Sequence, residues 1–342
     1  MVFPKSEFNK KSCRDANINK HLLAEMFERI EKEKYNIHSM ILLHEGSLVF
    51  DAYAHKFFEN TTSNVYSVSK SFLSVAIGIL VDLKLLDLDN PVLFYFTQDI
   101  DNYLPEYEKL KVSHLLTMTV GQEKDEFIGI DPQINPFKKF FNIPLKNEPG
   151  EVFLYNNFAS FILSVIVTKI TGKSVNDFLN EKLYKVIHIE KPVWDGYKQY
   201  SLGCTGLRIT LNDMVRFGHL ILNDGKWEDS QVVSKEYLDK ATDKHVAEPS
   251  SPLFYGYHFW VGKFVMAAGL YKQYVVVDKR YNIVFAMQAY EEREVIEIYY
   301  NYIVKAMERG WEISNISLRE YVRNFQINSQ KLIEKELNER TN

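Results

Sequence analysis

Apolar residues recur at helical spacing near the start of the chain and then at strand spacing. Residues 19–34 place apolar positions three and four apart with charges between them, which predicts an amphipathic helix. Two apolar runs, 37–43 and 48–54, are joined by the short polar segment 44–47, which predicts a β-hairpin. The stretch 66–86 begins with small polar residues and is then apolar for about four helical turns. A helix that is apolar on every side is buried, so we expect this one in the core.

The middle of the chain is predicted to be mostly helical. Residues 91–150 are irregular and rich in aromatics, and several prolines interrupt them. A second strongly apolar helix should follow and should end at Gly172. The helices expected in this part of the chain cover residues 113–119, 158–171, 175–184, 210–222 and 235–241.

The pattern returns to strands from residue 255. The expected strands cover residues 255–262, 264–269, 273–279 and 282–289, with turns at 269–272 and 279–282. A helix over 291–308 should follow. The tail, 311–342, has apolar positions within a charged stretch and is predicted to be helical.

Strands at both ends and helices between them predict an α/β fold of the α+β type. We expect an antiparallel sheet built from both termini and flanked by helices, with a mostly helical subdomain at about 85–250 inserted between the sheet segments. Residues 1–310 would form this domain, and residues 311–342 would be a C-terminal helical extension. A cleft between such parts is the usual place for a site.

Ser67 and Lys70 lie three residues apart at the N-terminal end of the first apolar helix. This spacing places both side chains on one face, with Cβ atoms about 5–6 Å apart. The helix dipole and the buried surroundings both disfavour a charged ammonium there. A neutral amine can take the proton of a nearby hydroxyl, which makes serine a nucleophile. The alternative is that Ser67 only caps the helix and Lys70 is solvated.

Tyr155 and Asn157 follow the Pro149-Gly150 turn and precede the second apolar helix. One interpretation makes Asn157 the N-cap of that helix and Tyr155 a half-buried packing residue. The other is catalytic, because a tyrosine beside a lysine can act as a base when positive charge favours the phenolate. Asn157 could then hold the lysine and hydrogen-bond a substrate carbonyl or amide.

A glycine in a late strand, Gly269, would let a substrate approach the backbone closely, although an ordinary hairpin turn explains it as well. Together, Ser67-x-x-Lys70, Tyr155-x-Asn157 and this glycine resemble the serine β-lactamase / penicillin-binding-protein superfamily. The sequence is most similar to its class C-like serine hydrolases, the branch with carboxylesterases and 6-aminohexanoate-oligomer hydrolases. The resemblance covers roughly residues 20–305.

The resemblance implies a β-lactamase-like fold and gives the motif residues their roles. Ser67 would be the acylated nucleophile, and Lys70 and Tyr155 would share the general acid and base work. Asn157 would orient Lys70 and the substrate. Water would then hydrolyse the acyl-enzyme, and neither a metal nor an organic cofactor is implied.

The resemblance also implies an oxyanion hole made by the Ser67 N–H and by the main chain at Leu270, just after Gly269. In the family the third motif is Lys-Thr-Gly or His-x-Gly, and its cation engages a carboxylate on the substrate. Residues 267–269 are Ala-Ala-Gly in this chain, without a cation. Lys272 could supply a displaced cation or could crowd the site, and the sequence leaves both readings open.

Charge and composition limit the other function classes. The formal net charge of −4 and the lack of a basic block argue against binding of nucleic acid or an anionic membrane surface. The cysteines, Cys13 and Cys204, are far apart, which is typical of a reducing compartment. The N-terminus lacks the apolar core of a signal peptide and no apolar run reaches the length of a membrane span, so we expect a cytoplasmic protein. The sequence contains no H-E-x-x-H, Walker A, G-x-G-x-x-G or G-x-S-x-G motif.

We therefore expect a serine hydrolase of the esterase or amidase type that cleaves a small-molecule ester or amide through an acyl-serine intermediate. A β-lactam or D-amino-acid-peptide hydrolase is one alternative, which Ala267 in place of the third-motif cation disfavours. A non-catalytic binding or regulatory protein on the same fold is the other, and Lys272 keeps it open.

Overall fold

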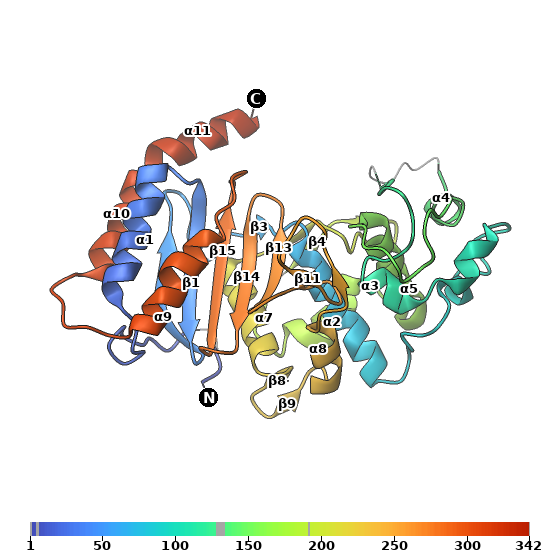
Figure 1. Cartoon of the computed structure of the whole chain (residues 1–342), viewed down its shortest axis with the longest axis horizontal. Coiled ribbons are helices and arrows are strands. Elements are labelled where there is room, and N and C mark those ends of the chain that lie inside the picture. Colours follow the sequence, from blue (N-terminus) through green and yellow to red (C-terminus); the bar gives the residue numbers. More distant parts are fainter. Residues whose placement is uncertain (1, 5–6, 128–133, 191, 342) are drawn as a thin grey trace. The chain divides into compact units, whose positions relative to one another are not determined.

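The computed structural model describes residues 2–4, 7–127, 134–190 and 192–341 (Figure 1). Two compact units make up the chain, and each is described by itself. Unit 1 comprises Met1–Ser63, Ile209–Leu222 and Ala268–Asn342, and unit 2 comprises Asn64–Arg208 and Asn223–Ala267. The boundaries proposed from the sequence at residues 85, 250 and 310 stay predictions.

Unit 1 contains four neighbouring antiparallel strands in the order β14-β15-β1-β2. Their bounds are β1 Ile37–His44, β2 Ser47–Tyr53, β14 Gln273–Asp278 and β15 Ile283–Ala289. Strands from the start and from the end of the chain thus pair with each other, which confirms the predicted antiparallel sheet built from both termini. The predicted β1–β2 hairpin is also confirmed, with Glu45 and Gly46 at φ 53° and 80° in its turn.

Helices cover both faces of these strands. Val284 of β15 lies against Gly218, and the next residue, Phe285, stacks on Tyr299 with ring centroids 6.0 Å apart. Successive strand residues point to opposite faces, so the two contacts lie on opposite sides of the sheet. Burial on both sides explains why β15 is apolar at every residue except Gln288 rather than alternating. The helices of unit 1 are α1 Lys20–Glu33, α7 Leu211–Leu222, the π-helical η4 Tyr299–Val304, α9 Lys305–Arg309, α10 Leu318–Asn328 and α11 Gln330–Thr341.

The C-terminal tail, predicted to be helical, forms α10 and α11. Figure 1 shows α10 beside α1, and the two helices meet where Phe325 approaches Phe27 with ring centroids 5.9 Å apart. α10 also contacts β2. The tail is therefore packed against the sheet of unit 1 rather than extended into solvent.

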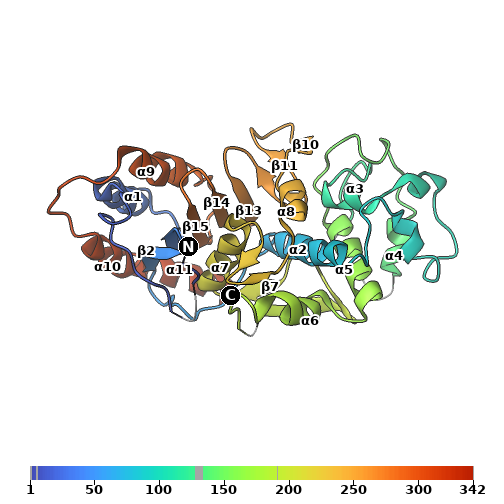
Figure 2. The same ribbon diagram turned by 90° about the horizontal axis from the view of Figure 1, so that it is seen from below.

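Unit 2 is organised around α2, Val68–Asp82, which contacts α5, α6 and α8 (Figure 2). Its residues from Val68 to Leu80 are all buried, which confirms the expectation for this apolar stretch. The helix ends before the predicted residues 85–86, because Lys84 adopts a left-handed φ of 59° and Leu85 N–H bonds back to Leu80 O. The other helices of unit 2 are η1 Val92–Tyr95, η2 Pro105–Lys109, α3 Val112–Leu116, α4 Pro136–Phe140, α5 Asn157–Thr171, α6 Val175–Leu179, the π-helical η3 Asn180–Tyr184 and α8 Lys235–Ala241.

The strands of unit 2 are short, and three of them, β3, β7 and β13, cross its boundary at one end. They are β3 Ser63–Asn64, β4 Val193–Trp194, β5 Gly196–Tyr197, β6 Tyr200–Ser201, β7 Leu207–Ile209, β8 Lys226–Trp227, β9 Ser230–Gln231, β10 Val246–Ala247, β11 Phe254–Tyr255, β12 Trp260–Val261 and β13 Val265–Gly269. The last two residues of β13 belong to unit 1. The helices around α2 therefore form the core of unit 2.

Two further predicted elements differ from the structure. The single strand expected over 255–262 is a tight hairpin between β11 and β12, because His258 is left-handed, with φ 61°, and Gly256 N–H bonds to Phe259 O. The helix expected over 291–308 begins only at residue 297, after an irregular stretch with a bend at Arg293. Both errors come from local backbone conformations that a hydrophobic pattern does not record.

The second apolar helix, α5, ends at Gly172 as predicted, and this C-cap residue is left-handed with φ 71°.

Among the described residues no single helix is long and apolar enough to cross a membrane. One helix pair, Asn157–Thr171 with Val175–Tyr184, passes the same test of length and composition but is bent by 64°.

Candidate active site

Ser67 occupies the N-cap position of α2, yet its side chain makes no capping hydrogen bond. The preceding residue, Tyr66, is left-handed with φ 47°, a conformation that costs a bulky residue about 1–3 kcal/mol. Ser69 supports this turn, since its Oγ donates to Tyr66 O at 2.5 Å and accepts from Leu207 N–H at 3.3 Å. The Ser67 hydroxyl therefore does not act as a helix cap, although the residue stands at the N-cap position.

Lys70 is buried, with only 1% of its surface exposed, and its ammonium group contacts three oxygen atoms. Lys70 Nζ lies 3.1 Å from Ser67 Oγ, 2.7 Å from Asn157 Oδ1 and 2.8 Å from the carbonyl oxygen of Cys204. All these residues belong to unit 2. Ser67, Lys70 and Asn157, which the sequence analysis singled out, are thus brought together at one amine.

The three partners differ in what they can do with a proton. The Asn157 and Cys204 oxygens only accept, whereas the Ser67 hydroxyl can accept or donate. A charged Lys70 would donate one N–H to each of the three oxygens. A neutral Lys70 would keep two N–H groups for the two carbonyl oxygens, and its lone pair would face the Ser67 O–H. The same geometry satisfies both states, so a proton can pass between Ser67 and Lys70 without rearrangement.

Asn157 is held by Asp125, which the sequence analysis did not identify. Asp125 Oδ2 accepts from Asn157 Nδ2 at 2.8 Å and from Asn157 N–H at 3.0 Å, and Oδ1 accepts from Phe158 N–H at 3.4 Å. The carboxylate thus occupies the positive N-terminus of α5. Because it takes the Asn157 Nδ2 donor, the amide oxygen must point to Lys70.

The N-cap of α5 is Asn156, not Asn157 as the alternative interpretation had it. Asn156 Oδ1 accepts from Ala159 N–H at 2.9 Å, and the Asn156 amide donates to Gln122 at 2.7 Å. Asn157 is therefore the first helical residue, and its side chain is free of the capping role. Asn156, which caps the helix, and Asn157, which contacts Lys70, are therefore neighbours in the sequence with different roles.

Cys204 contributes its backbone carbonyl and not its thiol. Burial raises the pKa of the Cys204 thiol to about 11, so this side chain is a small buried group and not an activated nucleophile. The carbonyl is directed by the neighbouring Gly203, which has φ 72° and would place a Cβ 2.8 Å from Ser160 O. A glycine before a buried residue is the signal that could have indicated this close approach.

Tyr155 lies beside the amine, since Lys70 Nζ is 4.8 Å from the centroid of its ring. The ring is parallel to Trp260 within 8°, at a centroid distance of 6.3 Å, and edge-on to Tyr255 at 6.2 Å. Phe153 contacts both Tyr255 and Trp260, at 5.3 and 6.2 Å. We call Phe153, Tyr155, Tyr255 and Trp260 the aromatic wall. Phe153, Tyr155 and Trp260 are half-buried, so the wall keeps an exposed apolar surface beside Lys70.

His258 supports the first turn of α2 through hydrogen bonds. Its Nδ1 lies 3.2 Å from Lys70 O, and its own carbonyl oxygen accepts from Ser71 Oγ at 2.7 Å. Burial lowers the pKa of His258 to about 3, and the charge of Lys70 acts in the same direction. The imidazole is therefore neutral at physiological pH and serves as a hydrogen-bonding support.

Gly269, Leu270 and Lys272 lie in unit 1, at the turn between β13 and β14. Leu270 is 58% exposed, and the Lys272 ammonium pairs with Glu294 at 3.3 Å. Lys272 is therefore engaged by a carboxylate of its own unit, which weakens its interpretation as a displaced third-motif cation. The oxyanion role of Leu270 stays a prediction.

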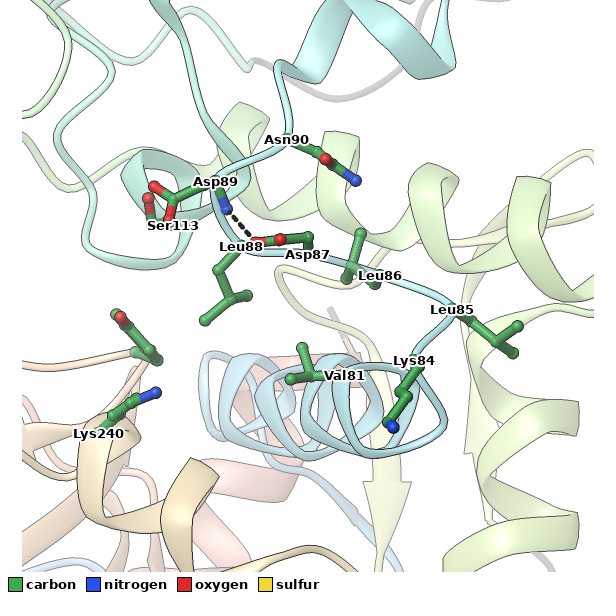
Figure 3. A pocket seen from close by; sticks show the side chains of 11 residues that line it. Val81, Lys84, Leu85, Leu86, Asp87, Leu88, Asp89, Asn90, Ser113 and Lys240 are labelled. Carbon is green, nitrogen blue, oxygen red and sulfur yellow. Dashed lines mark hydrogen bonds between the residues drawn. The ribbon is translucent and has the colours of Figure 1, made fainter.

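A separate hollow of about 630 Å³ lies at the other end of α2 (Figure 3). Val81, Lys84 and the following loop line it, and Asp89 N–H bonds to Asp87 Oδ1 there at 2.9 Å. A 15-residue helix is about 22 Å long, so this hollow is far from Ser67. Its described lining includes no residue that the sequence analysis predicted for the site, and we assign it no role in the chemistry.

We predict that the support from His258 makes stability depend on pH. The unfolded imidazole has a pKa near 6.5 and the folded one a pKa near 3, so between these values only the unfolded state binds the proton. The free energy of unfolding should therefore fall as the pH falls below 6.5, by at most about 1.4 kcal/mol per pH unit from this group. Above pH 7 this group adds no pH dependence.

Urea unfolding of the wild type and of His258→Asn between pH 7 and 4.5 tests this prediction. Asparagine tolerates the left-handed conformation at position 258 and does not titrate in this range. The variant should show a shallower slope, although not a flat one, because burial also lowers the pKa of His219 to about 4. Equal slopes for the two proteins would contradict the prediction.

The family model described as Beta-lactamase matches residues 27–295. An uncharacterized protein of Alkalihalophilus pseudofirmus is 24% identical over 234 residues, which span 60% of this chain and 64% of that protein. This chain thus aligns with less than two thirds of the length of that relative.

Three solved structures show the same fold. A candidate 6-aminohexanoate-dimer hydrolase from Bacillus anthracis superposes with a TM-score of 0.72 at 19% identity, covering 89% of this chain and 88% of that one. The octameric penicillin-binding protein homologue from Pyrococcus abyssi gives 0.68 at 19% identity, covering 84% and 77%. A candidate β-lactamase from Bacteroides dorei gives 0.73 at 17% identity, covering 84% and 98%.

These findings confirm both the predicted β-lactamase-like fold and the resemblance that the motifs indicated. At these identities the structural similarity shows the fold alone, whereas the family model covers most of the chain. The chain belongs to the Beta-lactamase family, within the superfamily of serine β-lactamases and penicillin-binding proteins.

Proposed function

We propose that this protein is a serine hydrolase that cleaves an ester or a small amide through an acyl-serine intermediate. The observation that carries the proposal is the environment of Lys70, whose Nζ lies 3.1 Å from Ser67 Oγ and contacts two carbonyl oxygens. These oxygens take two N–H groups of a neutral amine and leave its lone pair for the serine proton. This is the arrangement that a lysine-activated serine requires.

Acylation would begin when Ser67 Oγ attacks the substrate carbonyl carbon and its proton passes to the Lys70 amine. The carbonyl electron pair moves to oxygen, and the proposed donors for this oxyanion are the N–H groups of Ser67 and Leu270. The intermediate collapses by breaking the bond to the alcohol or amine, which leaves with a proton returned by Lys70. Tyr155, beside the same cation, would share this proton transfer.

Deacylation would reverse the proton path. Water attacks the acyl carbon of the Ser67 ester and gives its proton to the Lys70–Tyr155 pair. Ser67 Oγ then leaves and takes that proton back, so the free acid is released and the enzyme is restored. Asn157 and the Cys204 carbonyl would keep the amine in place through both steps.

The substrate we propose is neutral beside the reacting bond and carries an apolar group. Ala267 stands where the related β-lactamases and peptidases carry a cation for the substrate carboxylate. Instead of a cation, the aromatic wall beside Lys70 presents a half-exposed apolar surface, which includes Trp260 and Phe153. Both features favour an ester or simple amide over a β-lactam.

We predict that a fluorophosphonate probe adds once to the protein, at Ser67. Intact mass should show one adduct, and nitrophenyl acetate or butyrate should be turned over, and both should be lost in Ser67→Ala. An adduct without turnover would mean either that deacylation is defective or that the true substrate is quite different from these esters. A folded wild type without an adduct would refute the serine hydrolase and favour a binding protein on the same fold.

We predict that Asp125→Asn lowers kcat on the order of tenfold, because an amide at position 125 no longer forces the Asn157 oxygen toward Lys70. Glu123→Gln is the matched control, because Glu123 is an exposed partner of Lys146 on the same segment. Equal kcat values in wild type and Asp125→Asn would exclude this positioning role.

We predict that Trp260→Ala removes selectivity for apolar substrates. Two ester series should be compared, one varying the acyl group from acetyl to phenylacetyl, the other varying the alcohol from methyl to naphthyl. In at least one series the preference for the larger group should fall about tenfold in kcat/KM. Phe254→Ala is the control, because this aromatic residue of the same hairpin faces Lys244 instead. Unchanged preferences in both series would show that the aromatic wall does not bind substrate.

A further inference from the structure

The turn between β13 and β14 has a conformation that its residues do not favour. Tyr271 and Lys272 have φ angles of 56° and 67°, in the left-handed region that hairpin turns usually fill with Gly, Asn or Asp. Two successive non-glycine residues in this region are strained. The hydrogen bond from Lys272 N–H to Gly269 O closes the turn at 3.2 Å, and the Gln273 side-chain amide donates to Leu270 O at 3.3 Å and to Tyr271 O at 3.4 Å. These hydrogen bonds come from the turn and from the first residue of β14, and further contacts from elsewhere in unit 1 hold the two left-handed residues.

The segment that follows β15 supplies those contacts. The Tyr271 ring packs on Tyr290 with centroids 4.3 Å apart, and Glu291 N–H donates to Tyr271 O at 3.4 Å. The Lys272 ammonium pairs with Glu294 at 3.3 Å. Both strained residues are thus held by side chains from one short irregular segment of unit 1.

Helix α11 in turn covers this segment. Arg340 belongs to α11, and its guanidinium lies 3.9 Å from the centroid of the Tyr290 ring. The same guanidinium pairs with Glu336 Oε1 at 2.7 Å. Glu336 is only 3% exposed, and its other oxygen lies 2.7 Å from His38 Nε2 and 2.9 Å from Asn36 Nδ2. A buried carboxylate therefore fixes α11 to β1 and directs Arg340 over Tyr290.

The series of contacts runs within unit 1 from α11 to the turn. Arg340 stacks on Tyr290, Tyr290 packs on Tyr271, and Tyr271 follows Leu270 in the chain. Leu270 is the residue whose N–H we propose as an oxyanion donor. α11 lies beyond residues 27–295, the part of the chain that matches the Beta-lactamase family model.

We propose that α11 clamps the Leu270–Lys272 turn in its strained conformation, with Arg340 as a positioning residue that acts through Tyr290 and Tyr271. The catalytic consequence rests on the proposed serine hydrolase function. A relaxed turn would no longer hold the Leu270 N–H in a fixed direction, and an oxyanion donor acts only when it is preorganised. The C-terminal helix thereby becomes part of the catalytic apparatus without contacting the substrate.

Amide hydrogen exchange of the full-length protein tests the clamp without relying on activity. In Arg340→Ala, a peptide covering residues 268–275 should exchange faster than in the wild type, by about tenfold for a locally released turn. Lys335→Ala is the matched control, because this exposed lysine of α11 pairs only with Glu339 in the described contacts. Tyr290→Phe should retain protection because the ring remains, whereas Tyr290→Leu should lose it.

The kinetic consequence is tested with the same variants. Arg340→Ala should lower the rate of Ser67 phosphonylation and kcat by about tenfold with KM little changed, since removal of a whole oxyanion donor costs about 10²–10³. Arg340→Lys keeps a cation over Tyr290 and should restore part of the rate. Lys335→Ala and Tyr290→Phe should react like the wild type.

Two results would overturn the clamp. Unchanged exchange at residues 268–275 in both Arg340→Ala and Tyr290→Leu would show that α11 does not hold the turn. Faster exchange with an unchanged phosphonylation rate would show that the turn conformation does not serve catalysis. A wild type that is never phosphonylated would instead refute the proposed function, and the exchange result alone would then decide whether α11 holds the turn.

Discussion

A buried lysine amine must find an acceptor for each of its N–H groups, and this requirement organises the candidate site in unit 2. The acceptors of Lys70 come from its own helix at Ser67, from the start of α5 at Asn157, and from the loop at Cys204. Three separate segments must therefore converge on one atom. Leaving any of these contacts unmade would strand a polar group in the interior, which is costly. The geometry that suits proton transfer is thus also the geometry that allows Lys70 to be buried.

Much of the fold could be predicted from the sequence because periodic burial is a local signal. The amphipathic α1, the apolar α2 and α5, and the hairpin of β1 and β2 are all recognisable from the spacing of their side chains. The strand expected over residues 255–262 failed where backbone conformation, not hydrophobicity, decides. His258 is left-handed there, and nothing in the alternation of neighbouring residues indicates it.

The candidate site was predictable only in part, and the reasons differ from residue to residue. Ser67 and Lys70 share one helix, so their spacing alone brings them together. Asn157 required the family resemblance, since Asn156 beside it has the same side chain and is the actual helix cap. Asp125 lies in an irregular stretch whose course no periodicity describes. Tertiary structure alone shows that this carboxylate meets the start of α5.

The carbonyl of Cys204 has a consequence for how the site tolerates change. Because the acceptor is a main-chain atom, replacing the side chain at position 204 leaves it in place, and a mutational scan of that residue would report only on packing. The direction of the carbonyl depends instead on Gly203, whose left-handed conformation and close neighbours admit no side chain without strain. Substitutions at Gly203 should therefore disturb this part of the site more than substitutions at Cys204, although the Gly203 residue supplies no contact to Lys70.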